Sequence, residues 1–437
     1  MFKIKITNRW IVVIGAVLIQ LALGTIYSWG VLTPYFTSYL QAFNANIRYE
    51  HTQYIFAVGL FAFAVTMIFS GKLQQKYGPM LIGLVGAVLM SLGVILTIFM
   101  KTFAGAFISY GVLFGIGIGF GYVCPIACAA KWFPDKKGLI NGIAVAGFGA
   151  GAFIFNLIIK AFINPSNLQP TFFNLIDEKL YFNNPAIIAR VPWVFLLIGL
   201  IYLVMTAGGS LLLQNPPEGY LPEGYTPPVV KTVDGLTVET EFTRAETIKK
   251  PQFWMLWGMF ILTAAAGLFT IGNYKVFGQT STLGGIADKE SFLVLIGSIA
   301  ALFNGLGRVA WGFLADKIGY KKTMYAMFGT QAVLMILLPF VGGSATLFFI
   351  VVNLIYFCFG GNFSLYPTAT ADTFGVKNLG PNYGIVFTAY GIAGISGALL
   401  ATALRASIGF LGVFIIMGVF SMGAIVMAYF LRPPKHD

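Results

Sequence analysis

The stretch Gly312-Phe313-Leu314-Ala315-Asp316-Lys317-Ile318-Gly319-Tyr320-Lys321-Lys322 stands between two long apolar segments, and it decides the fold. Its Gly, Lys and Gly return 241 residues upstream as Gly71, Lys76 and Gly78. Four further matches occur at an offset of 242: Pro125 with Pro367, Gly138 with Gly380, Gly142 with Gly384, and Gly149 with Gly391. A nearly constant offset across three apolar segments indicates that the chain consists of two similar halves.

The composition indicates that lipid surrounds most of this chain. Hydrophobic residues make up 58% of the 437 residues, charged residues make up 10%, and the mean hydropathy is +0.83. A soluble protein is about a quarter charged, so a surface this poor in charge does not suit water. The apolar run that begins at Trp10 is too long for a signal peptide, and no small-residue cleavage site follows it. We therefore expect it to be the first membrane helix.

The apolar runs predict an all-α integral membrane protein with twelve transmembrane helices in two pseudo-symmetric six-helix bundles. A membrane helix needs about twenty consecutive apolar residues to cross the hydrocarbon core. Runs of this length are predicted at 10–36, 52–70, 80–100, 103–128, 139–160, 191–213, 252–274, 291–314, 323–342, 345–369, 382–404 and 408–431.

The distribution of basic residues predicts the orientation. With the N-terminus in the cytoplasm, eighteen of the 27 Lys and Arg fall in cytoplasmic segments, eight fall outside, and Arg308 lies within a span. This bias follows the positive-inside rule. The net charge of +12 therefore has a membrane explanation, and no nucleic-acid motif accompanies it. We expect a multi-pass protein of the plasma membrane with both termini in the cytoplasm.

One long connection divides the chain. Residues 214–250 contain five prolines and then a charged stretch, in which Thr243 and Glu246 have the spacing of a capping box. We expect a short surface helix at 243–250. The predicted organisation is an N-terminal bundle (1–213), a cytoplasmic linker (214–250) and a C-terminal bundle (251–437). Two such bundles around a central site suit transport by alternating access.

The stretch quoted first resembles the G-x3-D-K-x-G-x-K-K loop of the major facilitator superfamily, through Gly312, Asp316, Lys317, Gly319 and Lys321. An acid and several bases at a helix end can lock two helices in one state and release them in another. The alternative is a solvated positive-inside loop without a switching role. The copy at Gly71, Lys76 and Gly78 has Gln75 where the family has Asp, so we expect a weaker lock there.

A second resemblance is narrower. The stretch Lys131-Trp132-Phe133-Pro134-Asp135-Lys136-Lys137-Gly138-Leu139 looks like the W-F-P-D-K-R-G-L segment of the oxalate/formate antiporter family, a relative of the monocarboxylate transporters. Asp135 and Lys136 join the predicted switch loops on this ground. Other matches to that family are Tyr27-Ser28-Trp29, Pro251-Gln252-Phe253-Trp254, Phe303-Asn304-Gly305 with Arg308, and Asn382-Tyr383-Gly384. The resemblance implies transport of small carboxylate anions.

Arg308 is the strongest candidate for binding substrate. It is the only ionised side chain well inside a predicted span, and no Asp or Glu lies in the spans to pair with it. A charge at this depth usually faces a cavity or a partner. A guanidinium can hold a carboxylate through two parallel hydrogen bonds. The alternative is an arginine satisfied by backbone carbonyls or reaching to the inner surface. The family carries its substrate-binding arginine at this position.

Four polar residues are weaker candidates for the same site: Tyr27, Tyr122, Asn304 and Tyr390. Asn304 lies one helical turn before Arg308 and shares its face. The tyrosines could equally be packing residues. The family lines its central cavity with the spans that carry these four, and its oxalate carriers have a lysine at the position of Tyr390. One cation rather than two favours monocarboxylates such as lactate, pyruvate or formate over the dianion oxalate.

Other classes of function find little support. The glycine-rich runs at 115–121 and 147–151 have neither a preceding strand nor a Lys-Ser/Thr pair, so no nucleotide site is expected. We also expect no enzyme activity, cofactor, metal or nucleic-acid partner. Protons are a candidate coupling ion, although the spans contain no histidine. The open alternatives are an oxalate/formate exchanger, a carrier of another solute with a structural Arg308, and a non-transporting receptor of the same fold.

Overall fold

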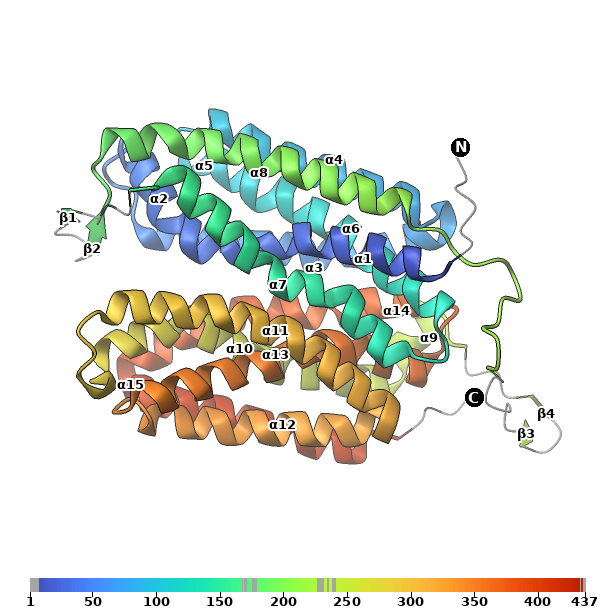
Figure 1. Cartoon of the computed structure of the whole chain (residues 1–437). Coiled ribbons are helices and arrows are strands. Elements are labelled where there is room, and N and C mark those ends of the chain that lie inside the picture. Colours follow the sequence, from blue (N-terminus) through green and yellow to red (C-terminus); the bar gives the residue numbers. More distant parts are fainter. Residues whose placement is uncertain are drawn as a thin grey trace.

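The computed structural model describes residues 8–166, 168, 171–174, 179–225, 232–233, 236–237, 241–432 and 434. The regular secondary structure of this part is helical apart from two antiparallel hairpins, β1 (Phe172–Asn174) with β2 (Lys179–Tyr181) and β3 (Thr232–Val233) with β4 (Leu236–Thr237). The two hairpins lie at opposite ends of the molecule (Figure 1). We call the end with β1 and β2 the β1–β2 end. The opposite end, where α1 begins and α15 finishes, is called the linker end.

The first group of helices runs from residue 10 to residue 211. Its members are α1 (Trp10–Leu23), α2 (Trp29–Gln41), α3 (Tyr49–Tyr77), α4 (Pro79–Leu96), α5 (Phe103–Ala106), α6 (Phe114–Trp132), α7 (Lys137–Ile163) and α8 (Pro185–Leu211). A 3-10 turn, Gly24–Ser28, joins α1 to α2 in the middle of the first span and carries Tyr27. A Cβ at Gly24 would collide with the backbone of Phe148, so glycine lets this turn approach α7.

The second group begins with the short α9 (Arg244–Lys249), whose capping box of Thr243 and Glu246 confirms the predicted surface helix. The long helices that follow are α10 (Pro251–Thr280), α11 (Lys289–Ile318), α12 (Tyr320–Leu337), α13 (Ala345–Phe374), α14 (Leu379–Val386) and α15 (Thr388–Phe430). Gly409 interrupts α15 with a φ of 66°, a conformation that suits glycine, so α15 comprises two successive helices.

Eleven helices in the described part are long and apolar enough to cross a membrane. The remaining predicted span, 382–404, runs through α14 and the first part of α15, and the side chains of residues 397–406 lie outside the description. Two predicted loops are wrong in their boundaries. Gly312, Asp316 and Lys317 belong to the end of α11, and Gly71 and Lys76 belong to the end of α3, because each helix continues to the residue before Gly319 or Gly78.

The two groups of helices touch through equivalent glycine contacts near the linker end. A Cβ at Gly138 would meet the carbonyl oxygen of Gly312, and a Cβ at Gly71 would meet that of Gly380. The offsets of 241 and 242 that relate the halves in sequence relate these two contacts in space. Contacts of Gly142 with Arg308 and of Gly384 with Met67 form a second equivalent set. The internal repeat is therefore also present in the packing.

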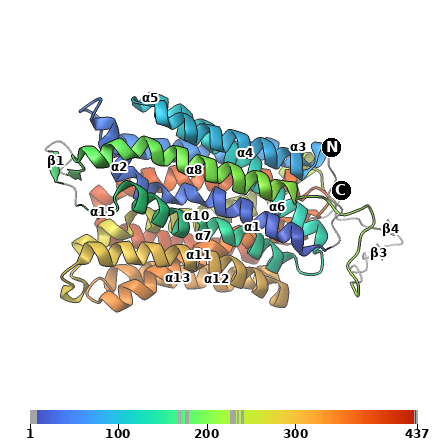
Figure 2. The ribbon, with the colours of Figure 1, turned by 45° about the horizontal axis from the view of Figure 1, so that its top comes forward.

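The halves converge at the linker end and diverge toward the β1–β2 end (Figure 1). In both views α7 of the first group lies against α11 of the second (Figures 1 and 2). We call this α7–α11 contact the first seam between the two groups of helices. The second seam joins α3 to α14 and α15. The candidate site lies between these two seams.

Candidate functional site

Arg308 is fully buried in α11, where the two groups of helices meet. Its Nε donates to Oδ1 of Asn304 at 3.0 Å, which fixes the guanidinium along its own helix. Its Nη1 donates to the carbonyl oxygen of Val145 in α7, also at 3.0 Å. The charge is therefore bonded to both groups of helices.

Two aromatic rings flank the guanidinium. The Arg308 Cζ lies 4.2 Å from the ring centroid of Phe363 in α13 and 5.2 Å from that of Phe148 in α7. Both distances are within cation–π range, which stabilises a charge that has lost its water. The alternative of an arginine that reaches to the surface is not what the structure shows, because the side chain is 0% exposed.

One nitrogen of the guanidinium remains without a protein acceptor. In the described part of the chain, the buried Nη2 of Arg308 makes no hydrogen bond. Within the same part, Arg308 forms no ion pair with a carboxylate. The ion pair found there joins Arg9 to Asp135, at the linker end. A buried N–H without an acceptor costs about 1–3 kcal/mol. An anion that binds at Nη2 would remove this cost.

Four tyrosine hydroxyls lie within electrostatic range of this charge. The Arg308 guanidinium interacts electrostatically with the phenol groups of Tyr27, Tyr122, Tyr383 and Tyr390. The structure thus brings together all five predicted site residues and adds Tyr383, which the sequence analysis missed. Tyr383 stands in the Asn382-Tyr383-Gly384 match to the antiporter family, and that match was the available signal.

The four hydroxyls fall into two pairs with different bonding. The hydroxyls of Tyr27 and Tyr390 are 2.7 Å apart and bridge the two groups of helices. Those of Tyr122 and Tyr383 are buried, lie near each other and near Arg308, and make no close, well-aligned hydrogen bond within the described residues. Arg308 Nη2, Tyr122 and Tyr383 therefore provide three donors that no strong protein acceptor holds. Three such donors can coordinate the oxygens of a small anion.

Aromatic rings form the walls of this polar centre. The Tyr122 ring centroid lies 5.1 Å from Phe63, 5.2 Å from Phe148 and 5.0 Å from Phe387. Tyr390 lies 5.2 Å from both Phe363 and Phe387. Such walls exclude water and suit a ligand with a short apolar body.

The predicted switch residues of α11 and α3 contact the opposite group of helices. Asp316 accepts hydrogen bonds from the backbone N–H groups of Gly138 at 2.8 Å and Leu139 at 2.7 Å, at the start of α7. A carboxylate at a helix N-terminus is stabilised by the helix dipole. At the equivalent position of the other seam, the Gln75 amide donates to Lys377 O and Asn378 Oδ1. That seam is bonded without a charge from α3.

The remaining switch residues stay within their own group of helices. Gly78 and Gly319 have φ of 88° and 86° and allow the sharp turns between α3 and α4 and between α11 and α12. Lys321 donates to the carbonyl oxygens of Tyr429 and Leu431 at the end of α15. Three other lysines lie at helix ends: Lys76 over the ring of Tyr77, Lys317 over Phe313, and the exposed Lys136 before α7.

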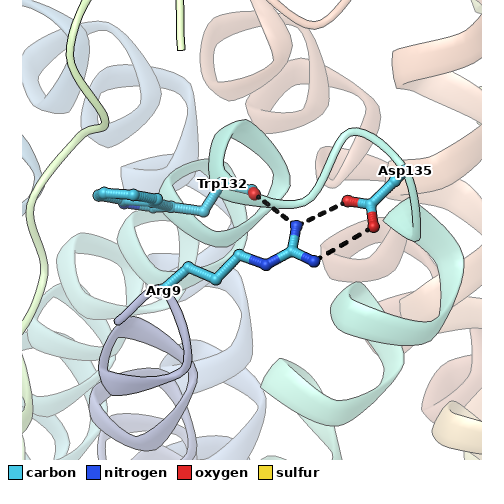
Figure 3. A network of polar contacts seen from close by, with 3 residues as sticks. All are labelled: Arg9, Trp132 and Asp135. Atoms are coloured by element: carbon cyan, nitrogen blue, oxygen red, sulfur yellow. Dashed lines mark hydrogen bonds and ion pairs between the residues drawn. The ribbon is translucent and has the colours of Figure 1, made fainter. Parts of the chain in front are cut away.

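Asp135 has a partner that the sequence analysis missed. Arg9 donates to its two carboxylate oxygens at 2.9 and 3.4 Å and to the Trp132 carbonyl oxygen at 3.3 Å (Figure 3). The guanidinium also lies 4.2 Å from the ring centroid of Phe133. In sequence Arg9 counts only toward the positive-inside bias, because 126 residues separate it from Asp135. This pair fastens the start of α1 to the α6–α7 connection within one group of helices.

Comparison with known proteins identifies the family. The sequence model of the Major Facilitator Superfamily matches residues 18–293 and 288–437. The chain belongs to the Major Facilitator Superfamily. It is therefore a multi-pass membrane transporter and not an enzyme, and the predicted fold class is confirmed.

Relatives of this superfamily member span nearly its whole length. Apicoplast pyruvate carrier 1 of Toxoplasma gondii is 29% identical over 94% of this chain and 87% of its own. The oxalate:formate antiporter of Oxalobacter formigenes is 28% identical over 98% of this chain and 92% of its own. The crystal structure of the transporter FucP in the outward conformation matches with a TM-score of 0.66 at 15% identity, covering 96% of this chain and 98% of that one. At this identity the match shows the fold alone.

Proposed function

We propose that this transporter carries small monocarboxylates, such as lactate, pyruvate or formate, by alternating access. The observation behind the proposal is the buried Arg308, whose Nη2 makes no close hydrogen bond within the described residues and lies near the hydroxyls of Tyr122 and Tyr383, which make none either. One carboxylate oxygen would bind Nη2 and the other would accept from the tyrosines. One anionic charge then meets one cation in a low-dielectric site, so no net charge remains buried.

Asn304 and the aromatic walls would complete the binding. Asn304 accepts from Nε of Arg308 and so fixes the orientation of the planar guanidinium. The rings of Phe63, Phe148 and Phe387 would enclose the short carbon chain of the substrate. The hydroxyl pair of Tyr27 and Tyr390 bridges the two halves and would sense the substrate from both sides.

Two relatives support a carboxylate substrate. We propose that the chain is a member of the oxalate/formate antiporter family, and the support is the motifs around Asp135 and Arg308 and the likeness to a pyruvate carrier and an oxalate:formate antiporter. The second relative also makes oxalate/formate exchange the second candidate function. The single buried cation argues against a dianion, because one charge of oxalate would lack a partner.

We assign the linker end to the cytoplasm on the positive-inside bias, and we place the protein in the plasma membrane. The functional units would be the bundles 1–213 and 251–437, with 214–250 as the cytoplasmic linker. The Asp316 bonds and the glycine contacts hold the linker end closed, so the conformation described here would be outward-facing. Asp316 would then be the main switch residue, and it would release α7 when the cytoplasmic side opens.

The test is transport by the purified protein in proteoliposomes. Uptake of radiolabelled lactate, pyruvate and formate is measured, with competition by oxalate, an amino acid and a neutral sugar. We expect competition among the monocarboxylates and weak competition by the other solutes. Protein-dependent uptake of a labelled amino acid or sugar, together with no protein-dependent uptake of lactate, pyruvate or formate, would overturn the proposal and favour a structural Arg308.

A further inference from the structure

The segment Glu241–Arg244 of the linker is bonded to the connection between α13 and α14. The Glu241 carboxylate accepts from the backbone N–H groups of Val376 at 3.1 Å and Lys377 at 3.0 Å. Phe242 donates its N–H to the Phe374 carbonyl oxygen at 2.9 Å. These bonds hold residues at the end of one membrane helix and before the next.

The same segment is anchored to α14 by buried contacts. The Phe242 carbonyl oxygen accepts from the amides of Asn378 at 3.2 Å and Asn382 at 2.9 Å. The Phe242 ring is 1% exposed and packs edge-on against Phe374 at 5.8 Å. Burial together with these hydrogen bonds makes this a fixed attachment rather than a surface contact.

Arg244 extends the attachment to the other half of the molecule. Its Nη1 donates to the carbonyl oxygen of Ile68 in α3 at 3.1 Å. Ile68 follows Met67, whose carbonyl oxygen is in contact with Gly384 of α14. Arg244 therefore spans the seam at a place where α3 and α14 touch.

The two seams of the linker end differ in the source of their carboxylate. In the α7–α11 seam, Asp316 of α11 holds the backbone N–H groups at the start of α7. In the α3–α14 seam, the residue equivalent to Asp316 is the neutral Gln75. There the carboxylate that holds backbone N–H groups, just before α14, belongs to Glu241 of the linker.

We propose that residues 241–244 act as a clamp on the α3–α14 seam and replace the charged lock that α3 lacks. Glu241 and Phe242 fasten the segment to α14, and Arg244 fastens it to α3. The clamp stabilises the closed linker end, and Arg244 must leave Ile68 before this end can open. The linker thereby sets the equilibrium between the two conformations of the transporter. The clamp rests on alternating access but on no particular substrate.

The test measures conformation without substrate. Spin labels are attached in α3 and α12 through Lys72→Cys and Lys322→Cys, both exposed at the linker end, and the distance distribution is recorded by double electron–electron resonance. Singly labelled proteins show whether the buried Cys124, Cys128 and Cys358 remain unlabelled. We expect Arg244→Ala to raise the ratio of open to closed linker end about threefold to tenfold, which is the effect of one such hydrogen bond.

Two further variants make the result specific. Lys249→Ala removes an exposed charge from the same short helix and should leave the distribution unchanged. Gln75→Ala removes the amide that donates to Lys377 O and Asn378 Oδ1 across the same seam, so it should open the linker end further when combined with Arg244→Ala. Should Arg244→Lys and Arg244→Ala both give monodisperse protein with an unchanged distribution, the clamp is wrong. Because the readout needs no substrate, a wrong substrate assignment would leave this result intact.

Discussion

Arg308 in α11 donates from Nη1 to the carbonyl oxygen of Val145 in α7 at 3.0 Å, so the buried guanidinium is bonded across the boundary between the two halves. A carboxylate that binds Nη2 would draw on the same planar group that holds this carbonyl. Binding would therefore change the strength of a contact that must rearrange when the halves move. A ligand shifts a conformational equilibrium only through such a difference in interaction between the two states.

The first prediction concerns the anchor itself. Arg308→Ala should abolish measurable substrate binding, and Arg308→Lys should retain less than about a tenth of the wild-type transport. Lysine keeps the charge but loses the planar fork that bonds Asn304, Val145 and the substrate together. A charged hydrogen bond is worth about 1.5–3 kcal/mol, or roughly a tenfold to hundredfold change in affinity. Uptake into proteoliposomes, normalised to the amount of inserted protein, measures the effect.

The matched control is Arg9→Lys. Arg9 is bonded to Asp135 and lies away from the candidate site (Figure 3). This substitution should leave substrate affinity unchanged. Full uptake by Arg308→Ala would show that this arginine has a structural role, and the carboxylate proposal would lose its main support.

The second prediction concerns the hydroxyls of Tyr122 and Tyr383. Tyr122→Phe and Tyr383→Phe should each weaken substrate binding about tenfold, because each removes one donor and leaves the aromatic packing in place. Tyr202→Phe is the control, since Tyr202 is an equally buried tyrosine that packs against Phe114 and Phe155 away from Arg308. Isothermal titration of the detergent-purified protein gives the affinities. Equal affinities in all three variants would remove both hydroxyls from the site.

The third prediction concerns coupling to protons. Among the described residues Arg308 forms no ion pair with a carboxylate, and its partner on the same helix is the neutral Asn304. We expect obligatory exchange, or a proton that moves with the substrate carboxylate itself. The measurement is uptake into vesicles with an imposed pH gradient and no internal anion. Strong gradient-driven accumulation that survives replacement of each pocket tyrosine would contradict obligatory exchange.

Asn304→Asp tests the coupling to protons by introducing a titratable carboxylate beside Arg308. The carboxylate that this substitution introduces would, when ionised, pair with Arg308 and compete with the anionic substrate, so transport should fall as the pH rises. Protonation of that carboxylate at lower pH should release the arginine and restore transport. A flat pH profile in this variant would mean that residue 304 does not control the charge of the anchor.

Much of this fold follows from periodicity and composition, but the loop boundaries do not. The repeat of Gly71 and Gly312 identified equivalent positions near the ends of α3 and α11, and these glycines meet Gly380 and Gly138 across the seams. Apolar length alone could not show that both helices continue to the residue before Gly78 or Gly319, because the last turns of α3 and α11 are polar. Hydropathy detects the part of a helix in lipid, and hydrogen bonding continues beyond it.

The candidate site was predictable at the one position where an ionised side chain lies within an apolar span. Arg308 stood out because a buried charge is rare in a span. Tyr383 did not, since one tyrosine among 20 in the chain carries no sign of facing a cavity. The bond of Arg9 to Asp135 and that of Arg244 to Ile68 join residues more than a hundred positions apart. Only the packing of the helices brings such pairs together.

The fourth prediction concerns the glycine contacts of the α7–α11 seam. A Cβ at Gly138 would meet the carbonyl oxygen of Gly312 and would lie 2.8 Å from Asp316 Oδ1. Gly138→Ala should therefore destabilise the closed linker end by about 1–3 kcal/mol through overpacking and favour the open conformation. Gly208→Ala is the control, because nothing lies within 4 Å of its Cβ position. The distance between spin labels at Lys72→Cys and Lys322→Cys measures the opening, and equal distance distributions in both variants would contradict the prediction.

The last prediction concerns substrate valence and Tyr390. Tyr390 is fully buried, bonded to Tyr27 and within electrostatic reach of Arg308, so a lysine there would place a second cation beside the first. A dianion needs two positive partners in a low-dielectric site, and Arg308 alone supplies one. At equal concentration, lactate should block uptake by the parent protein better than oxalate. Tyr390→Lys should reverse this order. Tyr390→Phe should weaken the binding of both anions and leave the order of lactate over oxalate unchanged. If oxalate already competes better than every monocarboxylate in the parent protein, the tyrosine hydroxyls must neutralise more charge than a neutral donor is expected to, and the argument from one cation is wrong.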